Sequence, residues 1–485
     1  MFPVKPNAYG SEEPPNAAYR GKDMHGNEGH FMPSPIWIAP FVVLLLSIAL
    51  LPLIPATRHW WEHNRNKLLL ALGLGLVTLV YYLLRGAGFH HAQPGWPTVV
   101  KVLGHAVLDD YVPFIVLLFS LYVISGGINL RGDLPARPST NLLFLWLGAA
   151  LASFIGTTGA SMLLIRPLLQ TNSERKHVKH TVIFFIFMVS NIGGSLLPIG
   201  DPPLFLGYLR GVPFLWTFNL WKEWLFACLV LGVVYYLWET QLYRRETPAD
   251  IARDERTLQP LRLRGSFNIV LLLFVVLAVG TLVPGQKFPG TDWEVPRLWH
   301  ELGFREIVQL VLAGISMWLT PTGIRKANDF NFTAIGEVAC LFIGIFICMQ
   351  VPIEILQGVG PMLASHGLTA PWFFFWATGG LSSFLDNAPT YVVYFETARS
   401  VQWGNSAELL SLATGGAIAV PLLRAVSLGA VFMGANTYIG NGPNFMVKSI
   451  AEQAGVKMPS FFSYMLYSIG LLIPLFLLIT VLFIQ

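Results

Sequence analysis

The stretch from Ser190 to Pro203 interrupts a run of apolar residues that would otherwise be long enough to cross a membrane. It places paired glycines, three prolines and Asp201 between the apolar residues 182–189 and 204–215. Proline removes a backbone donor and clashes with the preceding turn, so a helix must break here. In lipid, broken backbone is tolerated only where it is buried in protein or lines a wet cavity. Because a carboxylate at that depth costs roughly 2.5–3.5 kcal/mol, the break favours a functional site over a kinked structural helix with Asp201 at the membrane interface.

A second stretch of the same kind runs from Gly434 to Asn444, inside the apolar run 426–446. It repeats the order of an asparagine, an Ile-Gly pair, a polar residue and a proline. Two hydrophobic segments broken by Gly and Pro at corresponding positions of two halves are typical of the binding site of a secondary transporter. The pair therefore indicates transport rather than a structural kink.

The composition restricts the class of protein. Of the 485 residues, 54% are hydrophobic and 12% are charged, whereas soluble domains carry about 25% charged residues. The chain is therefore predicted to be a multi-pass protein of the lipid bilayer, in a bacterial inner membrane. The net charge of +4 gives no argument for a nucleic-acid partner. No nucleophile–base pair or metal triad stands out, so we expect no enzyme and no cofactor. Cys228, Cys340 and Cys348 lie in apolar runs and are interpreted as small core residues.

Each half of the chain is predicted to contain three spans, a hairpin, a broken span and a final span, since about 20 apolar residues cross a bilayer. In the first half these elements are expected at 36–53, 68–84, 111–129, 141–169, around Asn191 and at 221–243. In the second half they are expected at 267–283, 307–319, 333–351, 371–398, 426–446 and 461–483, with 407–423 partly in the membrane interface. Lys101, Asp109 and Asp110 are assigned to the loop before the third span.

The distribution of Lys and Arg predicts the topology. The loops around Arg58, Arg131 and Arg175 are basic and are assigned to the cytoplasm, with both termini outside. Both ends of 141–169 are then cytoplasmic, which predicts a re-entrant hairpin with its tip at 156–161. A normal span with a Gly-rich kink would invert everything downstream and place the Arg175 cluster outside.

These assignments predict an all-α polytopic membrane protein with two inverted repeats, each with five spans, one of them broken, and one re-entrant hairpin. The divisions are a polar extracytoplasmic segment at 1–35, repeat 1 at 36–243, a cytoplasmic linker at 244–265 and repeat 2 at 266–485. The segment 1–35 precedes the first apolar run and is not laid out as a cleaved signal peptide. Its His25 and His30 are interpreted as solvated residues rather than metal ligands.

Four polar segments are expected to converge at the centre of such a fold and to bind the substrate or ion. Their candidate residues are Thr157, Thr158 and Ser161; Asn191 and Asp201; Asp386, Asn387 and Thr390; and Asn436, Thr437, Asn441 and Asn444. Hydroxyl, amide and carboxylate oxygens are hard ligands of the kind that suits Na⁺, while the N-terminal ends of half-helices suit anions.

The ionisable residues in the apolar runs are candidates for charge coupling. A carboxylate held away from water favours its neutral form, so Asp201 and Asp386 can exchange a proton for a cation. Glu337 lies near the end of a span and is either a coupling group or an interfacial residue. Arg166 and Arg424 are expected either to pair with an acid or to bind a substrate carboxylate.

The motifs resemble those of the ion transporter superfamily, which includes citrate and dicarboxylate carriers, arsenite permeases and NhaD-type sodium:proton antiporters. Residues 190–194 followed by 200–203 are similar to its signature, and 157–161 and 386–390 are similar to its hairpin tips. The resemblance extends from Ile36 over nearly the whole chain and is closest to citrate-transporter-like proteins described as sodium:proton antiporters.

The resemblance implies a scaffold domain, a mobile transport domain, elevator-type alternating access and a homodimer. By motif it also implies Na⁺ sites at Asn191 and Asn436, and substrate contacts from hairpin-tip residues, namely Thr157, Ser161, Asn387 and Thr390. Dicarboxylate carriers typically have a Ser-Asn-Thr triplet in each half, whereas this chain has Ser-Asn-Ile at 190–192 and Ala-Asn-Thr at 435–437. That difference weighs against a dicarboxylate.

The sequence therefore predicts an ion-coupled secondary transporter, with Na⁺/H⁺ antiport as the first hypothesis because acids outnumber cations at the tips. The alternative is Na⁺- or H⁺-coupled symport of citrate or a dicarboxylate, with Arg166 or Arg424 as the counter-charge. A channel is a third hypothesis, because broken helices also line pores.

Overall fold

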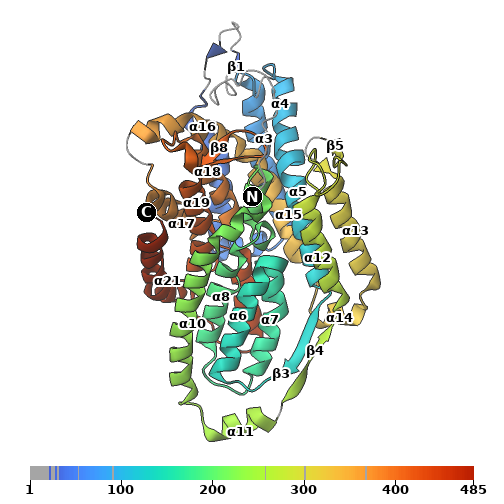
Figure 1. Ribbon diagram of the computed structural model, residues 1–485, viewed down its shortest axis with the longest axis vertical. Helices are drawn as coiled ribbons and strands as arrows, with labels where there is room; N and C mark the ends of the chain where they lie inside the picture. Colours follow the sequence, from blue (N-terminus) through green and yellow to red (C-terminus); the bar gives the residue numbers. More distant parts are fainter. Residues whose placement is uncertain are drawn as a thin grey trace.

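The computed structural model describes residues 21–22, 28–29, 32–52, 54–89, 92–256, 258–299, 302–365 and 369–484. Long helices run along the molecule, and the sheet in the described chain is limited to two-stranded pairs (Figure 1). His25, His30 and most of the segment 1–35 lie outside the described residues. The predicted all-α class is confirmed.

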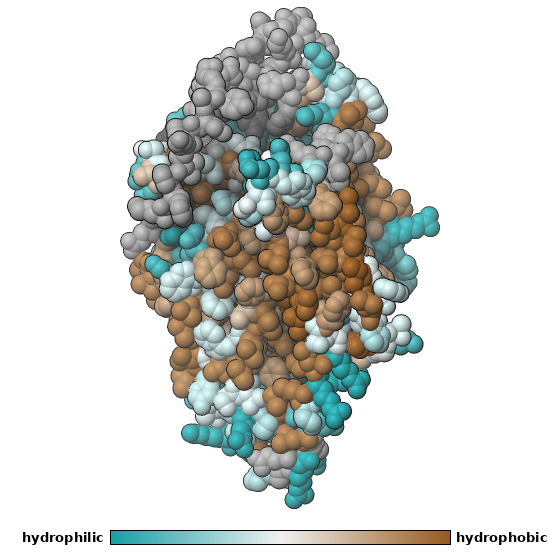
Figure 2. All heavy atoms as spheres, turned by 45° about the vertical axis from the view of Figure 1, so that its right-hand side comes forward, coloured by the Kyte–Doolittle hydropathy of each residue, from teal (hydrophilic) through white to brown (hydrophobic). Residues whose placement is uncertain are grey.

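Apolar helices of membrane-spanning length confirm that the protein is polytopic. In the described chain six helical stretches qualify: Asn64–Leu84, Trp96–Ser125, Pro138–Ile155, Phe214–Tyr243, Thr333–Gln357 and Phe461–Phe483. Pro35–Leu50 and Pro55–Trp61, bent by 102°, would together form a seventh. Figure 2 shows a broad apolar band between hydrophilic residues at the two ends of the molecule, as a bilayer requires.

The two halves of the chain share one order of elements. The first half contains α1 (Ala39–Leu50), α2 (Pro55–Trp61), α3 (Asn64–Leu84), α4 (Trp96–Leu103), α5 (Val112–Ser125), α6 (Pro138–Ile155), α7 (Thr157–Thr171), α8 (Lys179–Met188), α9 (Pro202–Leu209) and α10 (Trp221–Tyr243). The second half contains α12 (Phe267–Thr281), α13 (Phe304–Leu319), α14 (Thr322–Ala327), α15 (Thr333–Cys348), α16 (Gln350–Ser365), α17 (Pro371–Ser382), α18 (Asn387–Ser400), α19 (Val420–Met433), α20 (Gly442–Gln453) and α21 (Phe461–Phe483).

Contacts between the halves are reciprocal. Helix α3 packs against α15 and α5 packs against α13, while α9 packs against α18 and α20 packs against α7. In each of these two sets, the second contact repeats the first with the roles of the two halves exchanged. The opposite orientation of the two repeats and the boundaries drawn between them stay predictions.

The third span differs from its prediction. Its helix begins at Trp96 rather than at residue 111 and runs through a π-helical turn, Gly104–Tyr111, into α5. Asp110 therefore lies inside a helix and is buried, where the sequence placed it in a loop. Arg210, just after α9, donates to Asp110 at 3.2 Å, and this partner compensates a carboxylate that the apolar pattern could not accommodate.

Two connecting segments contain secondary structure that the sequence did not indicate. Within residues 407–423, β7 (Leu409–Ser411) and β8 (Ala417–Ala419) pair as a hairpin and α19 already begins at Val420, while the position of this segment in the membrane interface stays a prediction. In the linker, α11 (Pro248–Arg256) is followed by β4 (Gln259–Arg264), which pairs antiparallel with β3 (Asn129–Asp133). Main-chain pairing between distant segments leaves no apolar signature in one sequence.

The basic segments gather at one end of the molecule. Figure 1 shows β3, β4, α11 and α14 at that end and α4, α16 and β5 toward the other. Asn64, at the start of α3, donates to the carbonyl of Thr333, which brings the Arg58 segment near the α14–α15 connection. This arrangement agrees with the Lys and Arg bias from which the topology was predicted.

We predict that a cysteine at Leu261, an exposed residue of β4, reacts only with reagent supplied from the cytoplasmic side. The matched control is a cysteine at Asp292, an exposed residue of the loop after α12, which should react only from outside. Both are made in a background without Cys228, Cys340 and Cys348. Labelling of position 261 from outside by an impermeant maleimide in oriented vesicles would contradict the topology.

Candidate functional site

Two helical hairpins approach the centre from the two halves. In the first, α6 and α7 join at Gly156, whose φ of +79° is a left-handed conformation that favours glycine. The amides of Asn141 and Asn172 donate to each other, both at 2.8 Å, so the two ends of this hairpin lie together. In the second, residues 383–386 join α17 to α18, and Asp386 Oδ1 caps α18 by accepting from the Ala388 amide at 3.1 Å. The depth of both hairpins in the bilayer stays a prediction.

Two helices break where the sequence predicted. Helix α8 stops at Met188 and α9 starts at Pro202, while α19 stops at Met433 and α20 starts at Gly442. Glycine is needed at Gly193, because a Cβ there would lie 2.7 Å from the Ala149 Cα.

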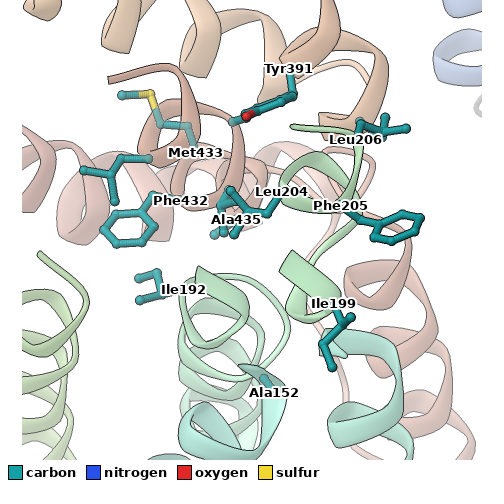
Figure 3. Packing of buried hydrophobic residues seen from close by; sticks show 14 of the residues in the cluster. Ala152, Ile192, Ile199, Leu204, Phe205, Leu206, Tyr391, Phe432, Met433 and Ala435 are labelled. Carbon is teal, nitrogen blue, oxygen red and sulfur yellow. The ribbon is translucent and has the colours of Figure 1, made fainter. Parts of the chain in front are cut away.

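The apolar residues around the breaks hold them together. Figure 3 shows Ile192 and Leu204 of the first broken span close to Phe432 and Ala435 of the second. All four of these residues are buried, and α19 packs against the turn Ile192–Ser195 inside the first break and against α9. The packing closes the breaks off from lipid and leaves their polar atoms facing one another.

Asp201 connects all four polar segments. Its Oδ1 accepts from the Thr157 hydroxyl at 2.8 Å and from the Asn441 amide at 3.2 Å, and its Oδ2 accepts from the Asn387 amide at 2.6 Å. These donors come from the first hairpin, the second broken span and the second hairpin. Asp201 is 1% exposed, and within the described chain no Lys, Arg or His forms an ion pair with it. The site is therefore a buried carboxylate surrounded by neutral donors.

Asn191 and Asn444 join the two breaks to each other. Asn191 donates to Asn444 Oδ1 at 2.7 Å and to the Ile186 carbonyl at 2.8 Å, and Asn441 donates to Asn191 Oδ1 at 3.2 Å. Asn444 donates to the carbonyls of Gly434 and Thr437, both at 2.9 Å. Both side chains are fully buried, so these bonds satisfy backbone that the breaks leave open.

Two amide oxygens are buried and accept no hydrogen bond: Asn387 Oδ1 of the second hairpin and Asn436 Oδ1 of the second broken span. Asn436 uses its amide nitrogen to donate to Ser383 Oγ at 2.9 Å, as Asn387 uses its own on Asp201. A buried acceptor without a donor costs free energy unless a ligand compensates it. Hard oxygens left open in this way are suited to an alkali cation.

The remaining candidates at the tips bond locally. Ser161 shares a hydrogen bond of 2.8 Å with Ser190, Thr437 donates to the Ser383 carbonyl at 2.5 Å, and Thr390 donates to the Asp386 carbonyl at 3.0 Å. Thr158 is half-buried next to Thr157. These residues shape the tips without touching Asp201.

The three coupling candidates lie away from Asp201. Glu337 pairs with Lys67 at 2.7 Å between α15 and α3, Arg166 pairs with Asp329 at 3.0 Å, and Arg424 pairs with Glu223 at 3.5 Å. Both arginines thus follow the alternative in which they pair with an acid. Neither supplies a counter-charge at the point where the four segments meet.

Sequence reasoning missed Ser383, which contacts both Asn436 and Thr437. The sequence feature that could have indicated Ser383 is the Ser382–Ser383 pair at the end of an apolar helix, just before the predicted tip. It also missed the buried cluster of Asp110, Arg210 and Glu396, in which Arg210 reaches Glu396 at 3.3 Å. Its members lie far apart in the chain, so no local pattern marks it.

Broken spans, paired helical hairpins and a buried polar centre define this membrane protein as a secondary transporter. A family model described as "Putative citrate transport" matches residues 31–484, and the chain belongs to that family. No curated protein matches the chain. Among the described residues no group of three His, Cys, Asp or Glu side chains is arranged to hold a metal ion.

We predict that Asn387→Ala and Asn436→Ala each raise the Na⁺ concentration needed for half-maximal transport by roughly tenfold, because each removes an open buried oxygen. The control is Thr378→Val, which removes a buried hydroxyl without a partner in α17, about one turn before the hairpin tip. Flux in proteoliposomes over a range of Na⁺ is the measurement. Unchanged Na⁺ dependence in both Asn variants would exclude these oxygens as ligands.

Proposed function

We propose that the protein is a Na⁺/H⁺ antiporter in which Asp201 binds a proton and Na⁺ in turn. The main observation behind this proposal concerns the buried carboxylate of Asp201. It accepts hydrogen bonds from the other three converging segments and has no cationic partner in the described chain. A buried charge requires compensation, which either a bound cation or a proton provides. The site is thus neutral when loaded with either ion and costly when empty, which is the condition for obligatory exchange.

The second carboxylate supports a cationic ligand. Asp386 caps α18 with its side chain and directly precedes Asn387, whose amide donates to Asp201. A second acid and several amides thus lie next to the hydrogen-bond partners of Asp201, and in the described chain no Lys, Arg or His bonds to either acid. A polycarboxylate placed directly at Asp201 would meet like charge there.

We propose elevator-type motion for the exchange. The packed pairs α3–α15 and α5–α13 are suited to form a scaffold, while the hairpins and broken spans, joined through Asp201, are suited to move as one body. The reciprocal contacts of the two halves support inverted repeats, and a homodimer of scaffolds is part of the same proposal.

Asp201→Asn keeps the size of the side chain and fixes it neutral. We predict loss of at least tenfold in Na⁺-driven pH change in vesicles, with the fold retained, because a neutral amide relieves the cost of a buried charge. Asp386→Asn is the matched control and should be milder, since Asn is also a good helix cap. Asp201 also precedes a helix, α9, but makes no side-chain cap bond, so its replacement removes no cap. Wild-type exchange in Asp201→Asn would refute the proposal.

The family description favours one second candidate, cation-coupled symport of citrate. In that case Asp201 would bind the coupling ion and citrate would lie beside it, at the half-helix N-termini. Proteoliposome flux with Na⁺, H⁺ and citrate varied separately distinguishes the two. Citrate uptake without any Na⁺-driven pH change would select the symporter over the antiporter.

A further inference from the structure

A cavity of about 950 Å³ lies at the far end of the first hairpin from its tip. It is bounded by the end of α7, the start of α8, the inner face of α10 and the connection from α20 to α21. Helix α7 rises about 21 Å from Thr157 to Thr171 at 1.5 Å per residue, so the cavity is a separate place from Asp201.

Most of the charged side chains that line the cavity are positive. Its cationic residues are Arg166, Arg175, Lys176, Lys179 and Lys457, and its single carboxylate is Asp329. Asp329 pairs with Arg166, and Glu239 and Glu246 pair with Arg175 from behind the wall. Lys179 and Lys457 have no ion pair among the described residues and are exposed. Two like charges from segments far apart in the chain thus face one space without compensation.

Two guanidinium groups on the wall keep open donors. Arg175 is 9% exposed; its Nη1 bonds to Glu239 and Asn172, while its Nη2 is buried without a hydrogen-bond partner. Arg166 bonds to Asp329 through Nη2, and its Nη1 is likewise buried without a partner. Buried guanidinium donors are costly to leave open, and oxyanions are the acceptors that match their geometry.

We propose that this cavity binds a small molecule with two or more oxyanion groups, carboxylate or phosphate. Lys179 and Lys457 supply the two uncompensated charges, and Arg175, a lining residue, supplies the open donor Nη2. The site lies among the basic segments predicted to be cytoplasmic, so its ligand comes from that side. The inference stands apart from the exchange reaction, because binding here involves none of the atoms around Asp201.

Isothermal titration calorimetry on the full-length protein in non-ionic detergent tests the site, with pyrophosphate and citrate as probes. We expect saturable binding that weakens as NaCl is raised, because exposed charges are screened. Lys179→Gln and Lys457→Gln should each weaken binding by about tenfold. Lys326→Gln, an exposed lysine of α14 outside the cavity, and Asp201→Asn should both bind as the wild type does.

The same titration in nanodiscs identifies the source of the ligand. Pyrophosphate binding that survives in nanodiscs containing cardiolipin, whose headgroup carries two phosphates, assigns the site to a soluble anion, and binding lost there but kept in phosphatidylcholine nanodiscs assigns it to a lipid headgroup. Absence of binding in detergent and in both nanodiscs would overturn the site, as would wild-type binding in both lysine variants. Loss of binding in Asp201→Asn alone would move the anion to the centre and overturn it as well.

Discussion

The structure depends on one constraint: backbone that leaves the helix inside a membrane must find its hydrogen bonds within the protein. An asparagine at each of the two breaks provides them. Asn191 closes the end of α8 through the Ile186 carbonyl, and Asn444 closes the second break through Gly434 and Thr437. The bond between Asn191 and Asn444 then joins the halves. The polar centre is thus a consequence of satisfying broken helices, and the ion site that we propose is built on it.

The placement of charge follows from the same constraint. Most buried acids elsewhere in the described chain have cationic partners, as Asp110 has Arg210 and Glu239 has Arg175, whereas the buried Asp133 near the β3 end has no ion pair among the described residues. Asp201 is held instead by a hydroxyl and two amides. Neutral donors orient the carboxylate without neutralising it, and this difference separates a structural acid from one that can exchange a cation. Basic side chains line the cavity at the end of α7 and the start of α8, about one helix length from Asp201.

Much of this architecture could be predicted from the sequence. The apolar runs predicted the helices. Gly and Pro within these runs predicted both breaks and the turn at Gly156, because these residues restrict the backbone locally. The candidate residues Thr157, Asn191, Asp201, Asn387 and Asn441 do meet. What the sequence could not give depends on contacts between distant segments: the pairing of β3 with β4, the early start of the third span and the partners of Arg166 and Arg424. That Asp386 caps a helix with its side chain and Asp201 does not could not be predicted either, since capping depends on backbone geometry at the break.

The central claim is that Asp201 gives up a proton when the site takes Na⁺. Proton release on Na⁺ addition to the purified, lightly buffered protein measures this without transport. The account predicts release that saturates with bound Na⁺ in the wild type and in Asp386→Asn, and none in Asp201→Asn. Na⁺ binding of wild-type strength in Asp201→Asn, with the same proton release, would contradict it.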